Sequence, residues 1–88
     1  MQALAASAIT ALQHCDLLEE AKYVHSQVLA RAPEALLERA VVGERTVWTF
    51  KPMVELVLHE LRYIAITRDL SPEARRERVR WTLDVAGF

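Results

Sequence analysis

The longest apolar stretch of the chain, residues 52–66, predicts the central helix of the fold. On a period of 3.6 residues, its polar positions gather in one narrow stripe formed by Glu55, His59 and Arg62. A helix that is apolar around most of its circumference must be covered on several sides. The rest of the chain is therefore expected to pack around this helix, and a change such as Leu61→Ala is expected to be costly.

Start and stop signals divide the rest of the chain into further helices. Asp16 is predicted to cap the second helix, with Glu19 completing a capping box. Gly43 is predicted to end a short third helix. Ser71 and Pro72 are predicted to begin the last one, because serine is a favoured cap and proline fits the first helical position. The helices are expected at about 2–15, 17–31, 33–42, 52–68 and 72–86.

Residues 44–51 are predicted to be extended, because they are rich in β-branched and aromatic residues. Thr46, Trp48 and Phe50 alternate there with Arg45, Val47 and Thr49. No partner strand is predicted elsewhere in the chain, so a strand here would have to pair across a dimer or remain unpaired. The expected fold is all-α: a small bundle of four to five helices with one short extended segment, at about 44–51.

Composition sets limits on what this chain is expected to do. Its 88 residues are expected to form one domain, residues 1–88. A net charge of −1 argues against a strongly basic nucleic-acid binder, and 52% apolar residues predict a homo- or hetero-oligomer. A single cysteine, Cys15, points to a reducing compartment and hence to the cytoplasm. No apolar run reaches 18 residues, so no membrane span is expected.

The first third of the chain resembles one tetratricopeptide-like helical hairpin, over residues 1–34. The likeness lies in Ala21 and, twelve residues later, Pro33. His25 and Val28 stand where that family has an aromatic and a small residue. The resemblance implies a protein-binding surface and no chemistry.

Residues with catalytic or metal-binding chemistry are few and are not arranged for it. Glu55 and His59 share a helix face, but the second histidine that a zinc protease motif requires is missing. Cys15 falls on the apolar face of its helix, where it is expected to act as a small hydrophobe. Two glycines are too few for a phosphate-binding loop. We therefore expect no enzyme activity, no metal and no cofactor.

The residues best suited to recognition are aromatic and arginine side chains, which are enriched where proteins bind each other. They are predicted to contact a protein partner: Trp48, Phe50, Arg75, Arg78 and Trp81. A competing interpretation places the two aromatics at 48 and 50 in the core. The leading hypothesis is a small cytoplasmic protein–protein interaction module, an adaptor, chaperone or regulator that acts by covering a partner's surface.

The alternative hypothesis is a dimeric transcriptional regulator. An extended segment followed by two helices resembles the ribbon-helix-helix family, in which strands from two chains pair and enter the major groove. That resemblance implies that Arg45, Val47 and Thr49 face DNA. The turn at 67–70 lacks the glycine usual in that family.

Overall fold

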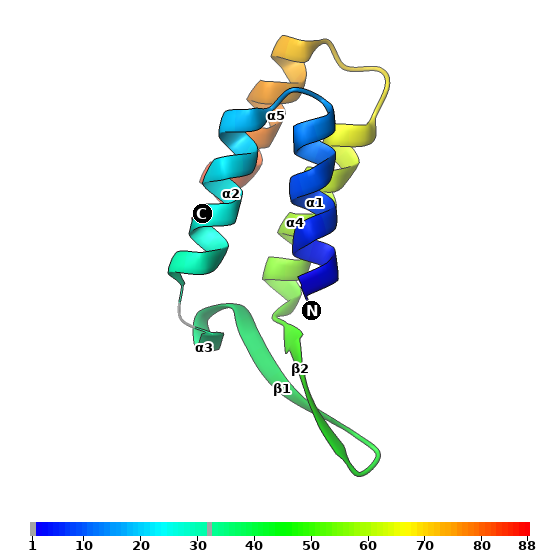
Figure 1. Ribbon diagram of the computed structural model, residues 1–88, viewed down its shortest axis with the longest axis vertical. Helices are drawn as coiled ribbons and strands as arrows, with labels where there is room; N and C mark the ends of the chain where they lie inside the picture. Colours follow the sequence, from blue (N-terminus) through cyan, green and yellow to red (C-terminus); the bar gives the residue numbers. More distant parts are fainter. Residues whose placement is uncertain (1, 32) are drawn as a thin grey trace.

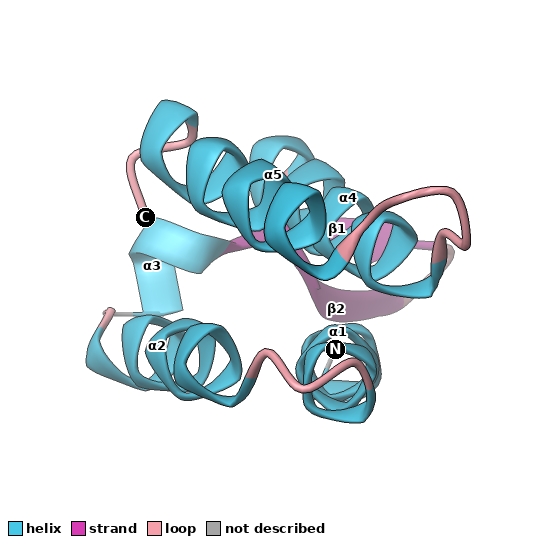
Figure 2. Cartoon of the chain, turned by 90° about the horizontal axis from the view of Figure 1, so that it is seen from above, coloured by secondary structure: helices cyan, strands magenta, loops and turns pink. Residues whose placement is uncertain are grey.

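The computed structural model describes residues 2–31 and 33–88. Its main body is a bundle of four helices: α1 (Gln2–His14), α2 (Leu18–Ala30), α4 (Pro52–Ile66) and α5 (Pro72–Val85). Seen from above, α1 and α2 form one layer, and α4 and α5 form the other (Figure 2). Each of these helices contacts two of the others. Their bounds agree with the predicted ones to within two residues, which confirms this part of the sequence-based prediction.

The predicted helix starts are only partly confirmed. At the start of α5 the Ser71 hydroxyl accepts a hydrogen bond from the Ala74 amide at 3.1 Å, as expected for an N-cap. The prediction for α2 was wrong. Leu17, not Asp16, precedes that helix, and no side chain caps it. Asp16 instead takes a positive φ of 63° in the tight turn after α1, a conformation that aspartate tolerates better than most residues.

The predicted third helix at 33–42 is also wrong. Only one turn, α3 (Pro33–Leu36), is helical, and strand β1 (Leu37–Val42) follows it directly. β1 pairs in antiparallel fashion with β2 (Arg45–Phe50), in a register that runs from Leu37 opposite Phe50 to Val42 opposite Arg45. The segment 45–50 therefore finds within its own chain the partner strand that the sequence did not reveal. The described residues are mostly helical, with one small two-stranded sheet.

The turn of the hairpin explains why a helix gives way to a strand here. Gly43 has a φ of 65°, which places the left-handed residue at the first turn position and matches a type II′ turn. That turn suits the twist of two antiparallel strands. The β-branched pair Val41–Val42 before it favours a strand over a helix. Gly43 is thus a turn residue and not a helix stop.

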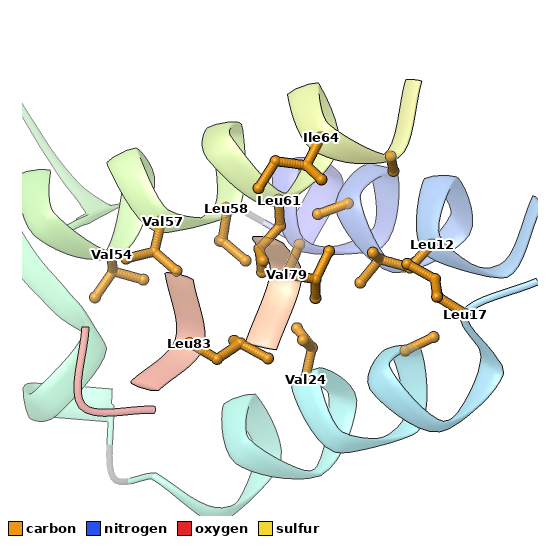
Figure 3. Packing of buried hydrophobic residues seen from close by; sticks show 14 of the residues in the cluster. Leu12, Leu17, Val24, Val54, Val57, Leu58, Leu61, Ile64, Val79 and Leu83 are labelled. Carbon is orange, nitrogen blue, oxygen red and sulfur yellow. The ribbon is translucent and has the colours of Figure 1, made fainter. Parts of the chain in front are cut away.

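The core lies between the two helical layers (Figure 3). Leu58 and Leu61 of α4 are completely buried, which confirms α4 as the helix at the centre of the packing. They meet apolar side chains from the other three helices, and Phe50 closes the core at the base of the hairpin. The largest fully buried side chains are Leu12, Val24, Leu58, Leu61 and Val79.

The connection between α4 and α5 is held by Arg75. Its guanidinium donates hydrogen bonds to the carbonyls of Ile64, Ala65, Thr67 and Leu70, at 2.6–3.2 Å. Three of these carbonyls belong to the C-terminal end of α4 or follow it, where backbone acceptors lack helical partners. A cation is also favourable at this negative end of the helix dipole. Arg75 therefore fixes the turn at residues 67–71.

The hairpin projects from one end of the bundle (Figure 1). The molecule is 47 Å long but only 23 by 19 Å across. A helix of 15 residues, the length of α4, spans about 22 Å. A strand of six residues adds about 20 Å. The hairpin thus accounts for nearly half of the length and is largely surrounded by open space.

Candidate interaction surface

The projecting hairpin exposes large apolar side chains. Trp48 of β2 is 57% exposed, and Val41 and Val42 beside the turn are more exposed still. Trp48 lies directly opposite Arg39 in the register, and Val41 lies opposite Thr46. A buried position for Trp48 was one interpretation of the sequence, and it is wrong. Phe50, two residues further along the same face, is buried as that interpretation expected.

Helix α4, which follows β2 after Lys51, carries a second exposed apolar group. Met53, Leu56, Tyr63 and Ile66 are each more than half exposed. Their spacing along the helix places Leu56 and Tyr63 opposite the buried Leu58 and Leu61, with Met53 and Ile66 on either side of them. As expected, α4 is covered on several sides, by α1, α5 and the base of β2, but these four apolar side chains lie outside that cover. We call these four residues, together with Val41, Val42 and Trp48, the hairpin–α4 surface.

A shallow pocket of about 330 Å³ lies along this side of α4. Its lining combines Leu56, Tyr63 and Ile66 with three polar residues: His59 and Arg62 of the predicted stripe, and Glu60 beside it. His59 Nε2 is 3.6 Å from Glu55 Oε1, and both side chains are exposed. The pair therefore has the geometry of a solvated surface contact, and the pocket has both apolar and polar residues in its lining.

The backbone of the hairpin offers unused hydrogen-bonding groups. The Lys51 amide donates to the Leu36 carbonyl at 2.8 Å, which extends the ladder one residue beyond the strands. Hydrogen-bonded and non-hydrogen-bonded pairs alternate in an antiparallel ladder. The main-chain groups of Thr46 and Trp48 on β2, and of Arg39 and Val41 on β1, therefore point outward. Within residues 2–31 and 33–88, no further strand pairs with either edge.

Three of the five residues predicted to contact a partner are exposed: Trp48, Arg78 and Trp81. Trp81 is 66% exposed and lies on α5, on the side away from the buried Val79 and Leu83. The other two are engaged inside the chain, Phe50 in the core and Arg75 on the carbonyls after α4. The structure thus does not bring the predicted set together in one place, and Trp48 is the one predicted residue that belongs to the hairpin–α4 surface.

The residues of the alternative hypothesis share one face of the hairpin. Arg45, Val47 and Thr49 alternate along β2, with Val47 half-buried and the other two exposed. Across the register they lie opposite Val42, Ala40 and Glu38. Residues 37–50 hold two arginines and two glutamates, so the hairpin has no net charge. Such a surface lacks the positive excess that contacts with DNA phosphates use.

The opposite side of the bundle holds a buried carboxylate that sequence reasoning missed. Glu20 of α2 is only 5% exposed, and its Oε1 lies 3.1 Å from Arg76 Nε and 3.8 Å from Arg80 Nη2 of α5. It borders an open pocket of about 350 Å³, whose lining includes Tyr23, Asp84 and Phe88. Two arginines explain why a glutamate is tolerated here, so the cluster joins α2 to α5 without a ligand.

Other chemistry is sparse in the described part of the chain. No group of three or more His, Cys, Asp or Glu side chains there is arranged to hold a metal ion. The Cys15 thiol is half-buried and donates to the Leu12 carbonyl at 3.3 Å. Among the helices of residues 2–31 and 33–88, none has the length and apolar character needed to cross a bilayer.

Comparison with known proteins gives no relative for this chain. No family model matches it, and no curated protein or solved structure matches it either. The likeness of residues 1–34 to a tetratricopeptide hairpin stays a prediction. The exposed side chains and the contacts described above are therefore the basis for any statement about function.

Proposed function

We propose that this chain is a small protein–protein interaction module without catalytic activity, and that it binds its partner through the hairpin–α4 surface. The observation that carries the proposal is the placement of Trp48. A tryptophan on a projecting two-stranded hairpin, more than half exposed, is costly to leave in water and well suited to a partner's pocket.

The four exposed apolar residues of α4 support the same surface. Helix faces with apolar side chains at a spacing of three or four residues are a common mode of protein recognition. Adjacent polar groups, such as His59 and Glu60, supply the polar rim that surrounds the apolar centre of most interfaces. The exposed Arg78 and Trp81 of α5 lie outside this surface in our proposal.

The cytoplasm is the compartment that we propose for this activity. Cys15 supports this compartment, because the sequence has no second cysteine with which it could form a disulfide. An adaptor, a chaperone and a regulator all act by covering a partner's surface, and the hairpin–α4 surface suits each of them.

Site-specific photo-cross-linking in the cells that produce the protein tests the proposal. A benzophenone amino acid would replace Trp48 in one variant and Tyr63 in another. Lys22 provides the matched control, because it is exposed on α2, the helix that packs against α1 and α5. We expect cross-linked products at positions 48 and 63, and none at 22. Absence of products at both test positions, or equal products at all three, would contradict the proposal.

The same experiment distinguishes a protein partner from the alternative, in which the chain is a nucleic-acid-binding regulator. Cross-links from position 48 to DNA, with an affinity for duplex DNA that falls steeply with salt, would favour that alternative. Because the hairpin has no net charge, we expect no measurable binding of duplex DNA at physiological salt.

A further inference from the structure

We infer that the partner on the hairpin is a second copy of this chain, which pairs with the outer edge of β2 to form a four-stranded antiparallel sheet across a two-fold axis. This inference rests on the proposed function, because it names the occupant of part of the hairpin–α4 surface.

The first argument is the incomplete state of the hairpin. A two-stranded hairpin is marginally stable alone and normally gains further strands or a covering helix. Here β1 and β2 contact mainly each other, with smaller contacts to α3 and α4 at the base. The outward amides and carbonyls of Thr46 and Trp48 form an open edge, the kind of edge that pairs readily with another strand.

The second argument is that β2 is complementary to itself. Residues opposite each other in an antiparallel sheet must point to the same face, so only certain registers are allowed. An axis at Val47 places Val47 opposite its own copy and Thr46 opposite Trp48. It also places Arg45 opposite Thr49. Pairs of β-branched and aromatic residues stabilise antiparallel sheets, and no like charges meet in this register.

Other positions of the two-fold axis on β2, and pairing through β1, are less favourable. Moving the axis to Trp48 places Arg45 opposite Lys51, so that two positive charges face each other. Pairing through β1 with the axis at Arg39 places that arginine opposite its own copy. Moving that axis to Ala40 places the charged Arg39 and Glu38 opposite valines. Like charges directly opposite each other destabilise a sheet, which counts against the axes at Trp48 and Arg39. An axis at Thr46 places Glu44 opposite Trp48 and Arg45 opposite Val47, so it sets charged residues against apolar ones, as the axis at Ala40 does. The axis at Val47 avoids both and is the register that we propose.

The register also accounts for the exposed start of α4. It places the turn of one hairpin beside Lys51 of the other copy, just before Pro52. Met53 of the second copy then lies near Gly43 and Glu44 of that turn, whereas Val41 and Val42 stay on the far side of β2. Residues 37–58 are a quarter of the chain's 88 residues, and all of them except Phe50, Val54, Val57 and Leu58 are at least partly exposed. A standard interface needs roughly 800 Å² per partner, about an eighth of this chain's 6166 Å².

The test compares two purified chains made by total synthesis, each with one methylated backbone amide. Methylation of the Trp48 amide removes an outward donor from the β2 edge. Methylation of the Arg39 amide removes the matching donor from the β1 edge, directly opposite in the register. Neither donor is used within the hairpin, so both chains are expected to melt like the unmodified protein. Mass is measured by light scattering over a dilution series.

The unmodified chain of 10.0 kDa is expected to give a mass of about 20 kDa at high concentration. Methylation at Trp48 is expected to raise the dissociation constant of the dimer roughly tenfold or more, and methylation at Arg39 to leave it unchanged. A monomer at every concentration, or equal weakening by both modifications, would overturn the inference. A monomer that still cross-links to another protein at positions 48 and 63 would overturn the dimer and leave the proposed function standing.

Discussion

The helical bundle and the hairpin differ in how many of their apolar side chains are buried within the chain. In the bundle, every long helix packs against two others and contributes buried side chains to one core. The hairpin keeps only Phe50 and its base in contact with that core, while Trp48, Val41 and Val42 face open space. The bundle therefore contains the core of the fold, whereas the hairpin presents exposed apolar side chains that are suited to binding. Stability and function are therefore expected to respond to different mutations.

The largest expected effect lies in the bundle core. Leu61 is 0% exposed, whereas Leu56 on the same helix is 63% exposed. Leu61→Ala is expected to lower the free energy of unfolding by about 2–5 kcal/mol, because it removes buried contacts and leaves a cavity. Leu56→Ala is the matched control and is expected to change it by less than about 0.5 kcal/mol. Urea unfolding of both variants, at a protein concentration too low for self-association, measures the difference in the free energy of unfolding. Equal losses of unfolding free energy in the two variants would contradict the assignment of Leu61 to a buried side of α4 and Leu56 to an exposed one.

A smaller effect is expected at the turn between α4 and α5. Arg75→Met removes the donors that four carbonyls share, and should cost about 1–3 kcal/mol. Arg78→Met is the control on the same helix, because Arg78 is exposed and makes no side-chain contact of this kind in the described structure. Thermal unfolding of the two variants tests the comparison. An Arg75→Met protein as stable as the control would remove the structural role assigned to this arginine.

The hairpin should respond locally to a change in its turn. Gly43→Ala forces a side chain into a left-handed conformation, at a cost of about 1–2 kcal/mol. No atom lies within 4 Å of the added Cβ, so the cost is purely one of backbone conformation. Amide hydrogen exchange is expected to accelerate in residues 37–50 and to stay unchanged in the bundle. Acceleration throughout the chain would mean that the hairpin and the bundle unfold as one unit.

The smallest effects on stability are expected for substitutions of the two exposed tryptophans, which should differ only in their effect on binding. Trp48→Ala and Trp81→Ala remove side chains that are similarly exposed, so each should shift the free energy of unfolding of the monomer by less than about 0.5 kcal/mol. We expect Trp48→Ala alone to weaken self-association, as measured by light scattering. Loss of association in both variants would place the interface elsewhere, and loss in neither would remove Trp48 from it.

The helical part of the fold was predictable because its signals are local. Proline and serine at helix starts and the apolar period of α4 depend on residues a few positions apart, and the structure confirms them. The strand at 37–42 was missed because Leu37 and Ala40 also fit a helical face. Its pairing with 45–50 depends on the turn at Gly43, which was interpreted as a helix stop.

The candidate surface was harder to predict for a related reason. Sequence shows that Trp48, Met53 and Leu56 are apolar, but only the packing shows which side of α4 faces away from the core. The ion pairs of the buried Glu20 with the exposed Arg76 and Arg80 join residues more than 50 positions apart. Neither a period nor a motif in the sequence indicates such a contact. Arg75 looked like a surface arginine for the same reason.

The measurement that most directly tests the central claim is hydrogen exchange at single amides of the hairpin, by NMR on the purified protein. Thr46 and Trp48 on one edge are compared with Arg39 and Val41 on the other. If a second copy completes the sheet along β2, the amides of Thr46 and Trp48 are protected at high concentration, while those of Arg39 and Val41 exchange rapidly. Equally fast exchange at all four amides would contradict the account, because nothing would then be paired with β2.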